Sequence, residues 1–533
     1  MTATETAAHA EPEPTEPVDA GPEPRPRRAT ALRYAAVAGL GALVVLRFVA
    51  HSHLWLDEAL TVNVARLPLR RLPDALRHDG APPLYYVMLH GWMRLFGTGT
   101  VAVRALSGLL GVVALPLTFA AGLRAGGRRT AWAAAVLMAA SPFAVRYSSE
   151  ARMYTLMLVL ALLGYLSLVE ALETPTTGRL AAVAAVTALL LYTHYWSIQL
   201  LAVVAVVLAV RARRPAGASA RRALVAMAVG ALALVPWLPV FVFQLRHTGT
   251  PWATNPGPNV LVDTVFDFAG PRAVVGELLG LVLLALAAIG VFGHAAGPGR
   301  LELRARPRRG TAELAVVVFG TLLLAMVLGF ATRAAFASRY ATAVLAPFVL
   351  LCGLGIAALP SRRAATAVLA GVVGLGLVGS GAEAATERTA AARVAAALRR
   401  SAGPGDVVVY CPDQLGPSVS RLLPVGRYRQ LTFPTGAGPE RVDWADYAHR
   451  NRTARAAPFA SRTLAGTGPT NTLWVVWAPG YRTYKARCQS LISTIGRSRP
   501  LRRVIKVKNG YWERAGLVRF RPGPPPPAPV ADQ

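Results

Sequence analysis

Charged residues are scarce in this 533-residue sequence, at 16% of the total. A soluble domain usually carries about 25% charged residues, so an entirely soluble protein is excluded. Lysine is nearly absent, since only Lys485, Lys506 and Lys508 occur among 57 basic residues. The remaining positive charge is arginine, and it gives a formal net charge of +30. These arginines are scattered between apolar stretches and no Gly/aromatic RNA-binding box accompanies them, so we expect no nucleic-acid partner.

Apolar residues make up 54% of the sequence, much of it in long runs. A helix needs about 20 such residues to cross a bilayer, and about eleven candidate spans meet or approach this length. They lie near 31–50, 102–123, 130–147, 153–171, 180–193, 196–210, 223–243, 273–293, 313–331, 339–358 and 364–381. The apolar segment Pro82–Phe96 is too short to cross and predicts a juxtamembrane or re-entrant helix. The sequence therefore predicts a polytopic α-helical membrane protein.

The arginines indicate the orientation of these spans, because cytoplasmic loops retain positive charge. Arginine clusters alternate with sparse loops in the order expected for a cytoplasmic N-terminus and an extracytoplasmic C-terminal domain. The first outer loop, about 51–101, is the exception because it is rich in arginine. Amphipathic helices lying on anionic headgroups would explain this charge.

Four regions follow from the composition. Residues 1–30 form a predicted disordered cytoplasmic tail, too acidic for a secretory signal, and residues 31–381 form the membrane domain. Residues 382–521 predict a small extracytoplasmic α/β domain, and 522–533 a disordered Pro-rich tail. Within the α/β domain we expect a helix over 383–400, strands over Val407–Tyr410, Leu473–Trp477, Val504–Val507 and Leu517–Phe520, and helices over Arg441–Asn451 and Arg482–Ile495.

Cysteine is also rare, with three residues in all. Cys411 and Cys488 both fall in the predicted extracytoplasmic domain, where an oxidising compartment favours a disulfide between them. Two unrelated buried thiols are the alternative. Cys352 lies within a predicted span and is interpreted as a small apolar filler.

Ionisable residues beside membrane spans are costly and tend to be functional. Here they gather at the predicted outer ends of the spans, whereas a transporter would place them near the bilayer midplane. The sequence thus predicts an outer, water-accessible cavity. Its candidate residues are Asp57, Glu58, Asp79, Glu150, Arg152, Tyr154, His194, Arg333 and Arg339.

Several of these residues have a purely structural alternative. Asp57 and Glu58 could cap a helix starting at Ala59. Glu150 could pair with Arg152 or Arg146. His194 could be an interfacial hydrogen-bonding residue, and Arg339 could snorkel to the membrane surface. Aromatic residues of the C-terminal domain could stack on a glycan or simply form its core: Trp444, Tyr447, Trp474, Trp477, Tyr481 and Tyr484.

A series of short motifs occurs in order along the first two thirds of the chain: LWLDEA, DGAPPLYYVMLHGWMRLFG, VRALSGLLG, SPFAVRYSSEARMYTL, LYTHYWS and SRYATAVLAPFVLL. This set resembles the lipid-linked sugar transferases of the GT-C superfamily. The closest likeness is to the protein O-mannosyltransferase and lipid A aminoarabinose transferase group, including its bacterial branch of mannosyltransferases. The resemblance covers roughly 31–360 and implies an N-in helical architecture with an acidic first outer loop.

The resemblance implies a glycosyltransferase that moves a sugar, mannose first among the candidates, from a polyprenyl-phosphate donor to a hydroxyl of a glycan, lipid or protein acceptor. Asp57 matches the family's catalytic acid residue and would act as general base in an inverting reaction, with Glu58 and Glu150 also in the catalytic group. The remaining matched residues would bind substrate: Asp79, Arg152, Tyr154, His194 and Arg339.

Two positions depart from the family pattern. Ala81 stands where the family often has His before Pro-Pro, and Ser149 stands where it usually has Gln. A divalent metal held by Asp57 and Glu150 is therefore an open alternative rather than a requirement. Transfer of another lipid-linked sugar in cell-envelope glycan assembly is one rival function, and transport of a lipid-linked envelope precursor is the other. The sequence leaves the sugar, the acceptor, the oligomeric state and the role of the C-terminal domain undetermined.

Overall fold

The computed structural model describes residues 27–249, 257–271, 273–297, 300–307, 309–331 and 336–523. Contacts divide the chain into two compact units, Met1–Ala42 and Leu43–Gln533. The described part of the first unit is helical and belongs to α1 (Arg27–Leu46). Most of the two tails predicted to be disordered, and Arg333, lie outside the described residues.

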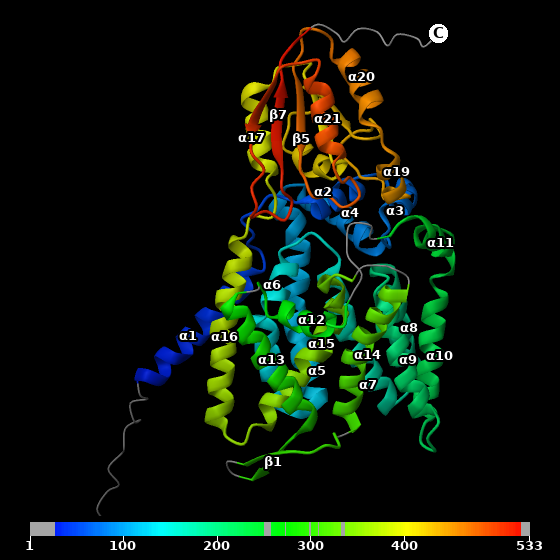
Figure 1. Ribbon diagram of the computed structural model, residues 1–533. Coiled ribbons are helices and arrows are strands. Elements are labelled where there is room, and N and C mark those ends of the chain that lie inside the picture. The colour runs from blue at the N-terminus through cyan, green and yellow to red at the C-terminus, as the bar shows by residue number, and fades with distance from the viewer. Residues whose placement is uncertain are drawn as a thin grey trace, which may run out of the picture. The chain divides into compact units, whose positions relative to one another are not determined.

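Helices dominate residues 43–385, and each predicted span overlaps one of them (Figure 1). Among the described residues, seven helices are long and apolar enough to cross a membrane. The helices that overlap the predicted spans after α1 are α5 (Thr100–Ala140), α7 (Tyr154–Glu173), α8 (Thr177–Thr193), α9 (Ser197–Ala212), α10 (Ala218–Leu232), α11 (Leu238–His247), α13 (Val274–Phe292), α14 (Arg309–Ala331), α15 (Thr342–Ala358) and α16 (Arg362–Ala385).

Two predicted spans are joined within α5. The helix is interrupted at Gly126 and at Gly127, where φ is 79° in the left-handed region that favours glycine. This break separates the segments that correspond to the predicted spans 102–123 and 130–147. Short elements connect the remaining helices: α6 (Pro142–Ser148), α12 (Val260–Phe268), the 3₁₀ helix η3 (Ser338–Ala341) and the hairpin of β1 (Gly293–Gly297) with β2 (Arg300–Leu303).

The predicted first outer loop folds into three helices, α2 (Leu56–Ala65), α3 (Leu72–Asp79) and α4 (Leu84–Phe96). The short helix α4 corresponds to the apolar segment that was predicted not to cross the membrane. Helix α2 begins earlier than the predicted Ala59, so Asp57 and Glu58 lie within its first turn rather than before it. The N-cap residue is Trp55, and its side chain makes no capping hydrogen bond.

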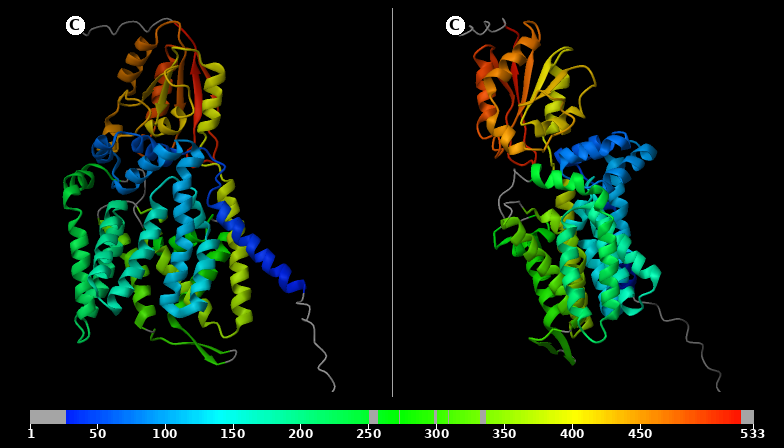
Figure 2. Two further views of the ribbon diagram at one scale, coloured as in Figure 1. Left: turned by 180° about the vertical axis from the view of Figure 1, so that it is seen from behind. Right: turned by 90° about the vertical axis from the view of Figure 1, so that its right-hand side faces the viewer.

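The C-terminal part contains a five-stranded sheet in the order β4-β3-β5-β7-β6. Strand β3 (Val407–Cys411) is parallel to β4 (Arg429–Thr432) and β5 (Leu473–Trp477), whereas β7 (Gly516–Phe520) is antiparallel to β5 and to β6 (Leu501–Ile505). The helices around it are α17 (Ala391–Ser401), α18 (Gly416–Ser420), α19 (Tyr447–Thr453), α20 (Ala456–Thr467) and α21 (Arg487–Gly496). The strands lie between helices in a layered α/β arrangement (Figure 2).

Several predicted boundaries in this part were wrong. The predicted helix 383–400 is broken into α16 and α17, because the backbone of Arg388 and Ala390 pairs with Glu513 instead of continuing the helix. Strand β6 and helices α19 and α21 are displaced from their predicted ranges. Strand β4 was not predicted, because its sequence RQLT lacks the apolar run of an interior strand and it lies at the sheet edge.

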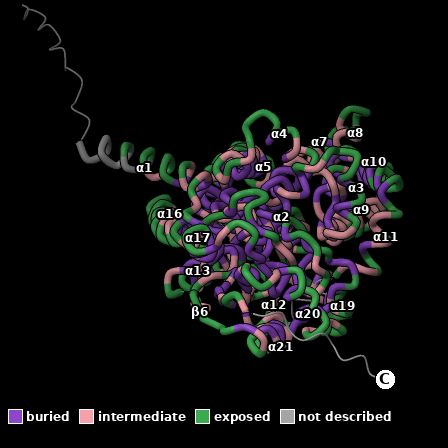
Figure 3. Tube along the Cα trace, turned by 90° about the horizontal axis from the view of Figure 1, so that it is seen from above, coloured by how far each residue is buried: buried purple, intermediate pink, exposed green. Residues whose placement is uncertain are grey.

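Backbone hydrogen bonds join the sheet domain to the ends of α3 and α11. The Trp444 N–H donates to the His78 carbonyl at 2.9 Å, and the Asp446 N–H donates to the His247 carbonyl at 2.8 Å. Helix α2 lies near the centre of the view from above, and most of its residues are buried (Figure 3).

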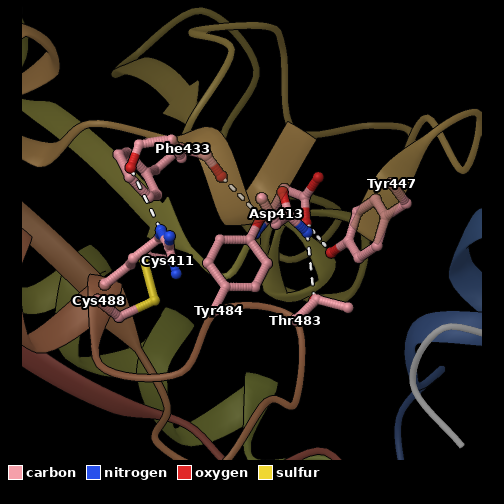
Figure 4. Close-up of a disulfide and its surroundings, with 10 residues drawn as sticks. Cys411, Asp413, Phe433, Tyr447, Thr483, Tyr484 and Cys488 are labelled. Atoms are coloured by element: carbon pink, nitrogen blue, oxygen red, sulfur yellow. Dashed lines mark hydrogen bonds between the residues drawn. A yellow bond between two sulfur atoms is a disulfide. The ribbon is translucent and has the colours of Figure 1, made fainter. Parts of the chain in front are cut away.

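Cys411 and Cys488 form a disulfide that joins the end of β3 to α21 (Figure 4). Beside it, Asp413 accepts hydrogen bonds from the Tyr447 hydroxyl at 2.5 Å and the Tyr484 hydroxyl at 2.9 Å. Tyr447 and Tyr484 are therefore part of the buried core of the C-terminal domain. Cys352 is buried in α15 and carries no disulfide.

Candidate active site

A cavity of about 200 Å³ lies at the ends of the helices that face the sheet domain. Five of the candidate residues line it together, although they come from five separate segments of the chain. Its charged and aromatic lining residues are Asp57, Asp79, Arg152, His194, Tyr195, Trp196, Arg339, Tyr340 and Trp444. Trp444 is the contribution of the C-terminal domain, so this aromatic residue reaches the cavity while Trp474 is fully buried in the sheet.

Helix α2 presents Asp57 to the cavity. An Asp57 carboxylate oxygen lies 3.2 Å from Nη1 of Arg339, which lies in η3 just before α15. One turn along α2, the Thr61 hydroxyl accepts a hydrogen bond from Arg152 Nη1 at 2.6 Å. Both guanidinium groups are thus anchored to the same helix. Since the side chains of Asp57 and Arg339 are 16% and 18% exposed, this ion pair can still be reached from the cavity.

A second carboxylate, Asp79, lies at the end of α3. It accepts a hydrogen bond from the Tyr86 hydroxyl at 2.6 Å. Burial raises the pKa of the Asp79 carboxyl above its usual range, although Arg152 and the Tyr86 hydroxyl oppose this shift. The following Gly80 has φ 86°, so the chain turns sharply here towards α4. The cavity therefore contains two carboxylates in different environments.

His194 lies in the turn between α8 and α9. Its Nδ1 accepts a hydrogen bond from the Trp196 backbone N–H at 3.2 Å. Burial, together with the nearby Arg152 and Arg339, lowers the pKa of His194 to about 3. The imidazole is consequently neutral at physiological pH and carries its proton on Nε2. His194 can donate a hydrogen bond, but it supplies no positive charge.

Tyr154 does not line this cavity. Its fully buried ring contacts His194, with ring centroids 5.9 Å apart, and packs edge-on against Tyr147 at 4.9 Å. Tyr147 thus packs against Tyr154, and Tyr154 in turn packs against the His194 imidazole.

Glu58 points away from the cavity into a buried ion pair. It accepts hydrogen bonds from Nε and Nη2 of Arg104 at 2.7 and 2.6 Å, and from the Ala151 N–H at 3.0 Å. Burial alone would raise the pKa of Glu58, but Arg104 and Arg388 hold it below its usual value. Both oxygens are occupied. This geometry suits a residue that joins α2 to α5 and to the loop before α7, not one that contacts substrate.

Glu150 is also fully buried and does not line the cavity. The nearest guanidinium is not Arg152, because Nη1 of Arg388 lies 3.9 Å from a Glu150 oxygen. Burial raises the pKa of Glu150, and the neighbouring Glu58 adds to the effect while Arg388 opposes it. Among the described side chains, neither Glu150 oxygen has a hydrogen-bond partner.

Arg388 was missed by the sequence reasoning. It is fully buried, lies 3.9 Å from both Glu58 and Glu150, and donates to the carbonyl and the hydroxyl of Ser149. Ser149, which departs from the family pattern, thus contacts this arginine directly. The segment between α16 and α17 has no local signal for such a role, because its partners lie more than two hundred residues away.

The two residues suggested as metal ligands do not lie together. Within the described ranges, no three His, Cys, Asp or Glu side chains come together as a metal site. Of the two suggested ligands, Asp57 faces the cavity and is paired with Arg339, whereas Glu150 faces Arg388.

Comparison with known proteins agrees with this architecture. Residues 80–242 match the family model described as dolichyl-phosphate-mannose-protein mannosyltransferase. The match includes Glu150, Arg152 and His194 but begins after Asp57 and Asp79. No curated protein matches the sequence significantly.

The predicted resemblance is confirmed by this family-model match and by a fold similar to that of solved ArnT structures. The chain is a multi-pass helical membrane protein with a C-terminal α/β domain. A similar solved structure is apo ArnT from Cupriavidus metallidurans, at 15% identity and TM-score 0.63, covering 92% of this chain and 98% of that one. ArnT bound to undecaprenyl phosphate is also similar, at 13% identity, TM-score 0.56 and the same coverage.

Proposed function

We propose that this protein transfers a sugar from a polyprenyl-phosphate donor to an acceptor hydroxyl at the outer face of the membrane, with inversion at the anomeric carbon. The observation that carries the proposal is the cavity shared by Asp57, Asp79, Arg152, His194 and Arg339. A solved ArnT of similar fold holds undecaprenyl phosphate, which supports a polyprenyl phosphate as the carrier. Mannose is the first candidate sugar because the matching family is described by a mannose donor.

Asp57 is the proposed general base. It is the carboxylate of α2 that faces the cavity, and it would take the proton from the acceptor hydroxyl as that oxygen attacks the anomeric carbon. The bond from the anomeric carbon to the phosphate oxygen breaks at the same time, and the electron pair leaves with the lipid phosphate. Direct displacement from the opposite side inverts the configuration and requires no covalent intermediate.

Arg152 and Arg339 are the proposed phosphate-binding residues. Guanidinium groups form strong charge-assisted hydrogen bonds with phosphate oxygens, and they stabilise the negative charge that develops on the leaving group. The neutral His194 would add one Nε2–H donor without adding charge. In the free enzyme, Arg339 is paired with Asp57, so donor binding would draw this arginine towards phosphate and release the base.

Glu58 and Glu150 are assigned positioning roles in place of catalytic ones. Each is buried outside the cavity against Arg104 or Arg388. Glu58 accepts the Ala151 N–H, and Arg388, which lies beside both carboxylates, donates to Ser149. These contacts hold the loop that carries Arg152.

The deciding experiment is transfer of radiolabelled mannose from synthetic polyprenyl-phosphate mannose by purified protein in nanodiscs, comparing wild type with Asp57→Asn. Loss of general base catalysis should lower kcat by about 10²- to 10⁴-fold. Glu302→Gln, an exposed carboxylate on β2, is the matched control and should retain activity. Full activity in a folded Asp57→Asn protein would remove Asp57 from the mechanism.

The sugar and the orientation are tested separately. Polyprenyl-phosphate mannose and polyprenyl-phosphate arabinose are compared at equal concentration, and a higher kcat/KM for the arabinose donor would overturn the assignment of mannose as the transferred sugar.

We propose a cytoplasmic N-terminus and an extracytoplasmic C-terminal domain. Impermeant maleimide labelling of Ser420→Cys in intact cells should therefore succeed, while labelling at Arg214→Cys should require permeabilised cells.

A further inference from the structure

A second cavity, of about 280 Å³, lies beside the candidate active site. Its walls are α2, the last turns of α3 and the loop 437–443 of the C-terminal domain. The lining residues include Leu60 and Val64 of α2, His78 and Asp79 of α3, and Ala437 and Glu440 of the loop.

The two cavities share Leu60 and Asp79 as lining residues. On α2, Asp57, Leu60 and Val64 are spaced three and four residues apart, so they lie along one helix face. Asp57 faces the first cavity and Val64 the second, with Leu60 between them. A molecule in the second cavity would thus lie next to the proposed base, on the other side of Leu60 and Asp79 from the two phosphate-binding arginines.

Hydrogen bonds hold the loop 437–443 over the second cavity. The Asn63 side-chain amide donates to the Glu440 carbonyl at 2.7 Å. His78 Nδ1 lies 2.9 Å from an Asp443 oxygen, and the Trp444 N–H donates to the His78 carbonyl at 2.9 Å. The cavity is therefore built by fixed contacts between the first outer loop and the C-terminal domain.

Negative charge dominates the lining. Four carboxylates line the cavity with one arginine, Arg441, and one histidine, His78. One further arginine, Arg450, pairs with Asp443 at 3.1 Å without lining the cavity, so the carboxylates still outnumber the guanidinium groups. The carboxylates are Asp74, Asp79, Glu440 and Asp443. Ionised carboxylates only accept hydrogen bonds, so they suit the hydroxyl and ammonium groups of sugars, whereas an anionic ligand would meet like charges at a cost in affinity. The first cavity differs, because two guanidinium groups balance its two carboxylates.

We propose that this second cavity is the acceptor site, and that it selects an uncharged sugar or an amino sugar over an anionic acceptor. The assignment rests on the proposed transferase function. It adds that the first cavity binds the anionic donor and that the second, acidic cavity binds the acceptor. Asp79, on the shared wall, would receive a hydrogen bond from the acceptor and align its attacking hydroxyl with Asp57.

The test uses three probes: methyl α-D-mannopyranoside, its 6-amino-6-deoxy analogue and its uronic acid. Their binding to the full chain in nanodiscs is measured by saturation-transfer NMR at pH 7.5, with and without undecaprenyl phosphate. The neutral and amino probes should bind at least about 10-fold more tightly than the uronate. Undecaprenyl phosphate should not displace them, because it occupies the other cavity.

Ala437→Trp is the blocking variant, since Ala437 is an exposed loop residue that lines the second cavity and not the first. It should weaken binding of methyl mannopyranoside at least about 10-fold and leave the affinity for undecaprenyl phosphate unchanged. The matched control is Val425→Trp, because Val425 is fully exposed on the same domain and lines neither cavity. A second variant, Glu440→Lys, should reduce the discrimination against the uronate to less than about 3-fold.

The acceptor site is overturned if none of the probes binds, if the uronate binds as tightly as the neutral sugar, or if undecaprenyl phosphate competes with methyl mannopyranoside. Equal binding by wild type and by folded Ala437→Trp also overturns it. These outcomes are distinct from failure of the proposed transferase reaction. If the mannose-transfer assay detects no reaction while the probes bind as expected, the sugar site stands and the proposed catalytic step is withdrawn.

Discussion

Substitution of Glu58 offers the sharpest test of how this site is held together. Glu58 receives two hydrogen bonds from Arg104 and one from the Ala151 N–H, and it lies 3.9 Å from Arg388. The side chains of Glu58 and Arg388 have no exposed surface, and that of Arg104 is 3% exposed. Removing the carboxylate therefore leaves buried positive charge that water cannot reach.

Breaking one side of a buried ion pair typically costs about 3–5 kcal/mol, because the remaining charge is unsatisfied. We expect Glu58→Ala to lower the free energy of unfolding by this amount. Glu58→Gln keeps the shape and loses only the charge, so its cost should be smaller, about 2 kcal/mol. Replacing both partners, as in Glu58→Met with Arg104→Met, should be less damaging than Glu58→Ala, since hydrophobic replacement of a whole pair is often close to neutral.

Equilibrium unfolding in mixed micelles, followed by tryptophan fluorescence over increasing SDS, measures these differences. Glu302→Ala is the control, because its ion pair with Arg304 is more than half exposed and should contribute little. The reasoning is refuted if Glu58→Ala unfolds within about 1 kcal/mol of wild type, or if the double replacement is no more stable than Glu58→Ala.

Three further predictions concern packing, pH and the disulfide. Gly290→Ala should lower the free energy of unfolding by about 1–3 kcal/mol in the same SDS assay, because a Cβ there would lie 2.0 Å from the Leu351 carbonyl oxygen. Gly371→Ala is the control and should be neutral, because a Cβ there meets nothing within 4 Å. Burial raises the pKa of Glu513 to about 7, so the folded state keeps this proton to a higher pH than the unfolded state does. About 3 kcal/mol of the free energy of unfolding, present below pH 4.5, should therefore be lost as the pH rises through 7. Hydrogen exchange over residues 391–520 of the full chain should show this loss, and Glu513→Gln should flatten it. Cys488→Ser opens a loop of sequence separation 77 and should accelerate the same exchange, at a cost of about 4 kcal/mol.

Each of these has a contrary result. Equal stability of the two glycine variants would show that the α13–α15 contact can relax. An exchange rate independent of pH between 5 and 8 would contradict a buried, proton-holding Glu513. Unchanged exchange in Cys488→Ser would mean that the domain core alone keeps the C-terminal part folded.

The sequence by itself determined the secondary structure of the membrane part. Each predicted span overlaps a helix, because a bilayer demands long apolar runs and such runs are local features of the chain. Strands β3, β5 and β7 were found for a similar reason, since each is a short apolar run buried on both faces. Edge strand β4 and the break at 386–390 were missed, because pairing with distant backbone decides them.

The sequence also predicted that the ionisable residues gather at one end of the helices, and five of them line one cavity. It did not separate the residues that face this cavity from those behind it. Asp57 and Glu58 are adjacent in sequence, but successive residues on a helix point about 100° apart, so one reaches the cavity and the other Arg104. Only the tertiary structure decides which of these two carboxylates faces the cavity. It also brings Arg388 and the loop 437–443 to the site, although each is more than two hundred residues from its partners in sequence. The physical reason is that the folded positions of distant loops determine which buried charges can pair.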